Sequence, residues 1–342
     1  MLEAMHLILL SPRFLCSTVA LRLTILCFSI VLISSCRQNP DLNKHKAGPR
    51  IQVLRQEEGY LFQENSRPVL FYQLTTKSLD GKYERSNYVH PLYGLDGEIM
   101  TQDFPDDHLH HRGFFWAWHR VFVGEVRAGN SWLGKSFIWE LQESNVLETK
   151  DGVRARFHWK SPEFQGGEDV IVEETTVIRV HESEEDFQKI DFEIRLVPQQ
   201  DQVYLGGSAS KKGYGGFSAR INMMVEDLTF IAAGGPVTAS RTPIDAGSWM
   251  DFSATFGESD QKSGLAILVH PSTVGYPQPW ILRSSSMKSM QNSVWPGPDM
   301  VLLPKHVEIF LRYRVVLHRG NAEKVPLEDL WNEYKGFNYD SM

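Results

Sequence analysis

Apolar and polar residues alternate with a period of two along most of the sequence after Arg50, and this alternation constrains the fold more than any other feature. A period of two places successive side chains on opposite faces of a β-strand, whereas an amphipathic helix needs a period near 3.6. The clearest case is 307–317, which has one apolar face and one mixed face. Further strands are predicted at 137–148, 153–159, 170–180, 190–196 and 265–269. The chain is therefore expected to be rich in β-structure.

Helical spacing of apolar residues occurs only near the end, at 327–334, between Pro326 and Gly336. No Pro/Gly-rich linker divides the rest of the body. We therefore predict an all-β fold, a single large antiparallel β-sandwich over residues 50–338 with a short C-terminal helix. Two smaller β-domains are the alternative.

All three cysteines, Cys16, Cys27 and Cys36, lie in the first 36 residues. A cysteine-free body excludes a disulfide framework, a thiol nucleophile and a thiolate metal site there. The apolar run 23–33 follows Arg13 and Arg22 and is shorter than the roughly 20 residues of a transmembrane helix. This pattern is typical of an export signal.

The small residues before Cys36 resemble the lipobox of bacterial lipoproteins, which implies cleavage after residue 35 and lipid attachment at Cys36. Residues 1–35 are then a lipoprotein signal peptide and residues 36–49 a polar tether. The expected location is the bacterial cell envelope, lipid-anchored and facing the periplasm or the cell surface. An uncleaved anchor or an ordinary signal peptide is the alternative. A net charge of −7 gives no indication of nucleic acid as a partner.

Histidines and tryptophans are concentrated in one part of the sequence. Five of the 12 histidines lie within 30 residues, at His90, His108, His110, His111 and His119. From Arg112 onward this segment is predicted to be a strand, with alternate residues on its two faces. One face would carry Phe114, Trp116 and Trp118, and the other Phe115, Ala117 and His119.

Three kinds of chemistry fit this segment. His108 and His110, beside Asp106 or Asp107, have ligand types that suit a divalent metal. An imidazole near a carboxylate can transfer protons near neutral pH. Aromatic faces beside polar groups hold sugar rings. The alternative without chemistry is that the tryptophans are core residues and the histidines lie in turns.

The segments 88–93 and 103–113, followed by the tryptophan-rich strand, resemble the PmoA-like family of exported bacterial proteins, a domain of unknown function. Weaker resemblances follow at 210–220, 249–251 and 270–283, so that the similarity extends over about 51–337. The family name points to a methane oxygenase subunit, which is an integral membrane protein. The sequence has no second apolar stretch of spanning length, so we expect no methane oxygenase activity.

The resemblance implies a galactose-mutarotase-like supersandwich, whose members bind, epimerise, cleave or eliminate carbohydrates. We therefore expect a carbohydrate-active lipoprotein that performs acid/base chemistry, namely hydrolysis, elimination or epimerisation, on a sugar or oxidised glycoside. The alternatives are a non-catalytic carbohydrate-binding lipoprotein and a metal-dependent enzyme using His108 and His110. Apart from that metal, no cofactor is indicated. The expected partners are a carbohydrate and, through the lipid, a membrane.

Candidate catalytic residues are the proton carriers His110 and His111, together with His270, which ends the buried strand 265–269. A buried structural role is the alternative for His270. The glycine-rich segment 206–216 either connects two strands or also delivers Lys212 and Tyr214 to the site. The candidate substrate-binding residues are Arg112, Trp116, Trp118, His119, Lys212, Tyr214, Trp280 and Arg283.

Overall fold

The computed structural model describes residues 50–222, 227–256, 261–285 and 288–339. These residues belong to one compact unit, Ala47–Met342. The predicted signal peptide, the tether and the lipid attachment site Cys36 lie outside the described residues. Within the described ranges, no helix is both long enough and apolar enough to cross a membrane.

The first large sheet has eight antiparallel strands in the spatial order β1-β2-β3-β6-β7-β15-β21-β20. Their bounds are Ile51–Arg55 (β1), Gly59–Glu64 (β2), Arg67–Gln73 (β3), Tyr88–Leu92 (β6), Phe114–Trp118 (β7), Gly215–Ile221 (β15), Lys288–Val294 (β21) and Trp280–Ser285 (β20).

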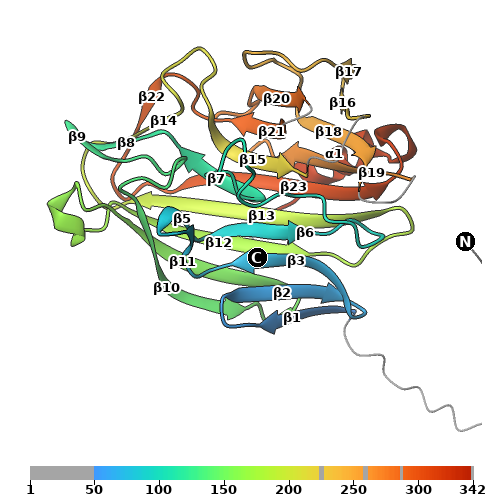
Figure 1. Ribbon diagram of the computed structural model, residues 1–342, viewed down its shortest axis with the longest axis horizontal. Helices are drawn as coiled ribbons and strands as arrows, with labels where there is room; N and C mark the ends of the chain where they lie inside the picture. The colour runs from blue at the N-terminus through green and yellow to red at the C-terminus, as the bar shows by residue number, and fades with distance from the viewer. Residues whose placement is uncertain (1–49, 223–226, 257–260, 286–287, 340–342) are drawn as a thin grey trace, which may run out of the picture. The chain divides into compact units, whose positions relative to one another are not determined.

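The second large sheet has nine antiparallel strands in the order β10-β11-β12-β13-β23-β19-β18-β16-β17. Their bounds are Ile138–Val146 (β10), Gly152–Lys160 (β11), Val172–Val180 (β12), Phe187–Pro198 (β13), Ile309–Arg319 (β23), Lys262–Val269 (β19), Trp249–Thr255 (β18), Thr229–Ala232 (β16) and Gly235–Val237 (β17). The long strands β10 to β13 run side by side in Figure 1.

Two small sheets and short helices complete the unit. The small sheets are β22 (Met300–Leu303), β14 (Val203–Gly206), β8 (Arg120–Val123) and β9 (Val126–Gly129), and the hairpin β4 (Lys77–Leu79) and β5 (Lys82–Arg85). The helices are the 3-10 turns Gln165–Gly167 and Ala322–Lys324 and the α-helix α1 (Leu327–Lys335). Helix α1 packs through Leu327, Leu330 and Tyr334 on the nine-stranded sheet (Figure 1). The predicted all-β sandwich with a short C-terminal helix is thus confirmed.

The two large sheets pack face to face across an aromatic core. Phe114 of β7 lies against Phe192 of β13, with ring centroids 6.1 Å apart. Phe217 of β15 stacks on Tyr313 of β23 at 4.2 Å. These rings are at most about 1% exposed, and burial of such apolar surface favours folding.

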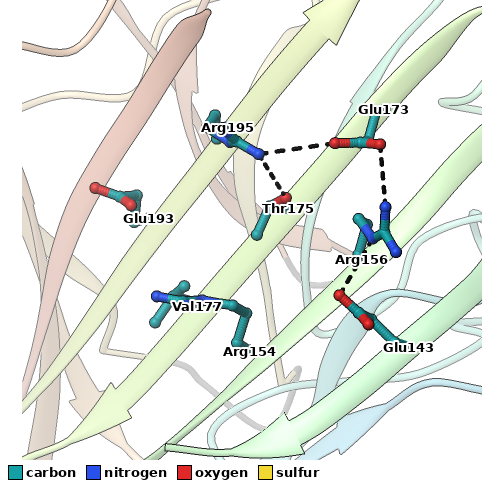
Figure 2. Close-up of a pocket in the computed structure, with 8 residues that line it drawn as sticks. All are labelled: Glu143, Arg154, Arg156, Glu173, Thr175, Val177, Glu193 and Arg195. Atoms are coloured by element: carbon teal, nitrogen blue, oxygen red, sulfur yellow. Dashed lines mark hydrogen bonds and ion pairs between the residues drawn. The ribbon is translucent and has the colours of Figure 1, made fainter. Parts of the chain in front are cut away.

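The outer face of the nine-stranded sheet carries charged side chains across β10 to β13. They surround a shallow hollow of about 560 Å³ (Figure 2). Arg156 lies 3.3 Å from Glu143 and 3.4 Å from Glu173, and Arg195 lies 3.7 Å from Glu173. Acids and bases on this face therefore pair with one another across strands. Exposed pairs of this kind contribute only about 0–1 kcal/mol each.

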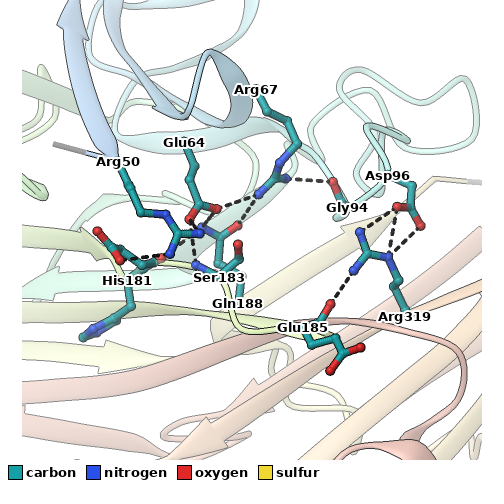
Figure 3. Close-up of polar contacts among 11 residues, drawn as sticks. Arg50, Glu64, Arg67, Gly94, Asp96, His181, Ser183, Glu185, Gln188 and Arg319 are labelled. Carbon is teal, nitrogen blue, oxygen red and sulfur yellow. Dashed lines mark hydrogen bonds and ion pairs between the residues drawn. The ribbon is translucent and has the colours of Figure 1, made fainter. Parts of the chain in front are cut away.

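A buried carboxylate joins the β2–β3 hairpin of the first sheet to the β12–β13 turn of the second (Figure 3). Glu64 is 2% exposed and lies 3.0 Å from both Arg50 and Arg67. It also accepts hydrogen bonds from the Ser183 amide at 2.9 Å and from Gln188 at 3.3 Å. Burial raises the pKa of Glu64, but hydrogen bonds from Ser183 and Arg67 and the charge of Arg50 outweigh burial and lower the pKa below its usual value. The contact fixes one end of the sandwich.

A second buried ion pair makes stability depend on pH. Asp191 of β13 accepts hydrogen bonds from Arg314 of β23 at 2.7 and 2.9 Å and from His181 at 2.7 Å. Burial opposes ionisation of Asp191, but hydrogen bonds from Arg314 and His181 outweigh it and lower its pKa from 3.8 to about 2. A lowered pKa in the folded state contributes stability above the unfolded pKa, and this stability is lost as the pH falls toward 2.

We therefore expect the difference in unfolding free energy between the wild type and Asp191→Asn to shrink by roughly 1 kcal/mol between about pH 6 and about pH 3. Urea unfolding at a series of pH values measures this difference. The surface variant Asp201→Asn, whose parent side chain is 82% exposed and pairs with Lys305, is the control. A wild-type advantage over Asp191→Asn that stays constant down to pH 3 would contradict the assignment.

Candidate functional site

The histidine-rich segment forms a loop between β6 and β7. Its two ends are joined by the bridge between Asp103 and Arg112, whose side chains form an ion pair at 3.0 Å. Within the loop, the His108 amide donates to the Pro105 carbonyl at 2.9 Å, and the His111 amide donates to the His108 carbonyl at 2.8 Å. Two consecutive turns therefore fold three nearby histidines toward one another.

The three imidazoles form a tight cluster. Ring centroids lie 5.6 Å apart for His108 and His110, 4.9 Å for His108 and His111, and 4.6 Å for His110 and His111. Burial, reinforced by nearby His108, lowers the pKa of His110 to about 3. Burial beside His110 and Arg220 lowers the pKa of His111 well below its usual value. Both rings are neutral at neutral pH and suit hydrogen bonding better than proton transfer.

His108 differs from its neighbours because a carboxylate orients it. Its Nδ1 lies 2.7 Å from Asp107, and Asp107 lies 2.5 Å from Arg220 of β15. Burial raises the pKa of Asp107, but hydrogen bonds from His108 and Arg220 outweigh this and lower it, so that the carboxylate is ionised. An ionised carboxylate only accepts hydrogen bonds. In neutral His108, Nδ1 therefore carries the proton, and Nε2 is the basic nitrogen.

The opposite wall comes from the glycine-rich loop between β14 and β15. Arg283 of β20 donates two hydrogen bonds to the Tyr214 hydroxyl, from Nε at 2.8 Å and from Nη2 at 2.6 Å. Because the phenolic oxygen accepts both bonds, its own proton is left to donate elsewhere. Lys212 lies in the same loop and is exposed.

Two glycines fix the path of this loop. Gly213 has a φ of +63°, and a side chain there would also meet Pro298. A Cβ at Gly207 would meet the carbonyl oxygens of Gly213, Tyr214 and Gly297. Only glycine combines this backbone conformation with such close approach. The segment thus connects two strands and also brings Lys212 and Tyr214 to the pocket.

These two walls enclose a pocket of about 250 Å³. Its lining consists of His108, His110, His111, His119, Trp132, Leu133, Lys212, Tyr214, Arg220, Arg283 and Met290. His119 stacks on Trp132 with centroids 5.2 Å apart, and burial lowers the pKa of His119 to about 4. No Asp or Glu among the described residues lines this pocket.

The structure brings most of the predicted polar site residues into this pocket. They are His108, His110, His111, His119, Lys212, Tyr214 and Arg283. The sequence pointed to Asp107 only as a possible metal ligand, whereas in the structure it bonds to His108 and to Arg220. The buried Arg220 and the aromatic Trp132 were not predicted as site residues. The adjacent pair Asp107-His108 was a signal that could have identified the oriented histidine.

Two predicted stacking residues face the other side of their strand. Trp116 and Trp118 are 2% and 0% exposed and point into the sandwich core. Trp116 donates to Glu174 at 2.5 Å, and Trp118 donates to the Trp295 carbonyl at 2.8 Å. The structure therefore gives these rings a core role and does not bring them to the pocket.

Three further predicted residues lie elsewhere. Arg112 is fully buried, and its guanidinium donates to Asp103 and to backbone carbonyls of the β4–β5 hairpin. His270 bonds to Ser272 at 2.7 Å and packs against Tyr334 of α1. Trp280 is buried and donates to the Gly247 carbonyl at 3.0 Å. None of these three side chains lines the histidine pocket.

A metal role for His108 and His110 stays a prediction. In the part of the chain that the structure describes, no group of three or more His, Cys, Asp or Glu side chains is arranged to hold a metal ion. The nearest carboxylate, Asp107, is already engaged by Arg220 and His108.

Comparison with known proteins gives one family and several distant folds. Residues 61–332 match the family described as "Family of unknown function (DUF6807)". The predicted resemblance to a family of unknown function is confirmed at this level, and its PmoA-like name stays a prediction. No curated protein matches the sequence.

Similar solved structures include a GH36 alpha-galactosidase from Geobacillus stearothermophilus, with 9% identity and a TM-score of 0.37, covering 79% of this chain and 40% of that one. An alpha-galactosidase from Lactobacillus brevis has 8% identity and a TM-score of 0.37, with coverages of 80% and 39%. A galactose mutarotase related enzyme from Lactobacillus acidophilus has 7% identity and a TM-score of 0.38, with coverages of 80% and 98%. This chain spans about two fifths of the length of the two galactosidases. A shared fold at this level does not determine function.

Proposed function

The chain belongs to the DUF6807 family, whose function is unknown, so we infer the activity of the protein from its pocket. We propose that the protein binds a sugar and transfers protons to and from this sugar. One observation carries the proposal. An imidazole oriented by a carboxylate, a hydroxyl held by a guanidinium and an ammonium group line one pocket, through His108, Tyr214 and Lys212. This is the combination of base, acid and charge that proton transfer requires.

The size and lining of the pocket suit a single sugar ring. Its volume of about 250 Å³ lies below the roughly 300–1,000 Å³ typical of sites for drug-sized ligands. A neutral imidazole has one donor and one acceptor nitrogen. His108 keeps its acceptor Nε2 for a sugar hydroxyl, because its Nδ1 is bonded to Asp107. The apolar lining residues are Trp132, Leu133 and Met290. Trp132 and Met290 are each 2% exposed, so the partly exposed Leu133 is the one available to the C–H face of a ring.

In the proposed mechanism, His108 Nε2 takes a proton from the sugar and Tyr214 donates one. Arg283 stabilises the phenolate that Tyr214 would form, and the Lys212 charge stabilises negative charge on a sugar oxygen. Glycosidases commonly use two carboxylates, and this pocket has none in its described lining. The site therefore fits ring opening, epimerisation or elimination better than hydrolysis. The proposed lipid anchor at Cys36 and the envelope location rest on the sequence alone.

The test is a panel of aldoses and uronic acids incubated with the protein in D2O and followed by proton NMR. Saturation transfer reports binding, while anomeric exchange, deuterium incorporation and unsaturated products report proton transfer. We expect binding and at least one of these reactions. Binding without reaction would leave only the non-catalytic alternative, and no binding of any sugar would overturn the proposal.

Tyr214→Phe is expected to lower turnover about 10- to 100-fold, because it removes the proposed proton donor and keeps the ring. The loss should appear in kcat rather than in affinity. Tyr204→Phe is the matched control, since Tyr204 lies on the preceding strand β14 and outside the pocket lining. Wild-type turnover in Tyr214→Phe would remove the tyrosine from the mechanism.

A further inference from the structure

We propose that the sugar is anionic, and that a longer saccharide extends from the pocket into an adjoining cationic groove. The inference rests on the proposed function, because it names the class of sugar that the same pocket takes. It is carried by the distribution of charge around Lys212 and Arg283.

Among the described residues, the lining of the pocket contains the cations Lys212, Arg220 and Arg283 and no carboxylate. Arg220 is compensated by Asp107, which lies 2.5 Å away. Lys212 and Arg283, by contrast, form no ion pair with any described residue. The whole chain carries a charge of −7, so the positive pocket does not follow from overall composition. An uncompensated positive concave site raises the local concentration of anions.

The two cations have different roles. Every N–H of Arg283 is engaged: Nε and Nη2 bond to Tyr214, and the remaining donors bond to backbone carbonyls of Ser240, Arg241 and Leu282. Arg283 therefore contributes charge and holds Tyr214, but has no donor left for a ligand. Lys212 is exposed and keeps its three ammonium donors, so it is the group that contacts the anion.

A groove of about 670 Å³ adjoins the pocket. Its lining consists of Lys212, Ala239, Ser240, Arg241, Leu282, Arg283, Ser284 and Ser285. Lys212 and Arg283 line both hollows, which places the anion at their junction. Arg241 adds a further cation, and no described acidic residue lines the groove. The groove therefore also favours negative charge, so that it suits the further units of a longer anionic saccharide.

Matched sugars test the charge preference directly. Isothermal titration calorimetry compares glucose with glucuronic acid, galactose with galacturonic acid, and both acids with glucose 6-sulfate. We expect each acid to bind at least about 10-fold tighter than its neutral partner, with a difference that shrinks at high salt. Preference for the carboxylate or the sulfate ester identifies which anionic group is recognised.

The lysine pair in the loop provides a matched variant and control. Lys212→Gln should lower affinity for the uronic acids about 10-fold more than it lowers affinity for their neutral partners. Lys211→Gln removes the same charge from the neighbouring position, which lines neither hollow, and should change nothing. Arg241→Gln should lower the affinity for digalacturonic acid but not for galacturonic acid, because only the longer ligand reaches the groove.

The outcomes separate this inference from the proposed function. Equal binding of neutral and acidic sugars would overturn the charge preference and leave the sugar site intact. Equal effects of Lys211→Gln and Lys212→Gln would overturn the assignment of Lys212. Binding of neither kind of sugar would overturn the proposed function itself.

Discussion

Replacing Glu174 with alanine should lower the free energy of unfolding by about 4 kcal/mol or more. Glu174 lies on β12, is fully buried in the sandwich core and accepts four hydrogen bonds. The donors are Asn87 at 2.7 Å, Trp116 at 2.5 Å, Trp159 at 2.6 Å and Thr176 at 2.8 Å. Alanine would leave all four donors without this acceptor.

The size of the effect follows from the position of this network. Trp116 belongs to the first sheet, whereas Trp159 and Thr176 belong to the second, so the carboxylate joins the two sheets. A buried donor that loses its partner costs about 1–3 kcal/mol, and the cavity adds to this. Burial raises the pKa of Glu174 despite the four donors. The buried carboxylate of Glu174 is therefore stable in the core only while all four donors bond to it.

Urea unfolding followed by tryptophan fluorescence and circular dichroism measures the effect. Glu173→Ala is the matched control, since it removes the adjacent carboxylate from the exposed face of the same strand (Figure 2). Its surface ion pairs with Arg156 and Arg195 predict a loss below about 1 kcal/mol. If Glu174→Ala does not fold, Glu174→Gln keeps one acceptor oxygen and should be intermediate. Equal losses for the Glu173 and Glu174 variants would contradict the role of the network.

Local sequence patterns predicted the long elements well. Alternation at 307–317 corresponds to β23, Ile309–Arg319, and the spacing after Pro326 corresponds to α1, Leu327–Lys335. The pairing of strands was not predictable, because it depends on contacts between distant segments. For example, β23 lies between β13 and β19 although more than 100 residues separate β23 from β13. Short strands such as β4 and β17 carry too few residues for a periodic signal.

The sequence predicted which types of residue form the site, but not which face of each strand points toward it. Alternation along β7 defined two faces but not which face meets the other sheet, because both carry aromatic residues. In the structure, the side chains of Trp116 and Trp118 lie in the core between the sheets, and those of Phe115 and Ala117 lie on the opposite face, toward the pocket. Asp107 is held in place by its bond to Arg220, which lies 113 positions later in the sequence. No local pattern could have revealed that contact.

Turnover of the sugar substrate should fall by roughly 10²–10⁴-fold in His108→Ala, the usual contribution of a general base. Among the clustered imidazoles, His108 is the one whose ring nitrogen bonds to an ionised carboxylate. The variant keeps the ion pair between Asp107 and Arg220 that holds the loop on β15, so stability should change little. His158→Ala, on the outer face of the nine-stranded sheet, is the control. Steady-state kinetics by NMR on the reactive sugar of the panel measures the loss.

Asp107→Asn separates positioning from catalysis at this histidine. The amide keeps the shape of the side chain but removes the charge that fixes the His108 tautomer, so kcat should fall. It also removes the charge that pairs with the buried Arg220, so the free energy of unfolding should fall as well. The pH profile of kcat should shift as well, which a purely structural defect would not produce. The variants His110→Ala and His111→Ala test the alternative, in which a buried imidazole transfers the proton. If either of these abolishes turnover while His108→Ala does not, the proton carriers are the buried imidazoles, and their low pKa values would have to rise when the sugar binds.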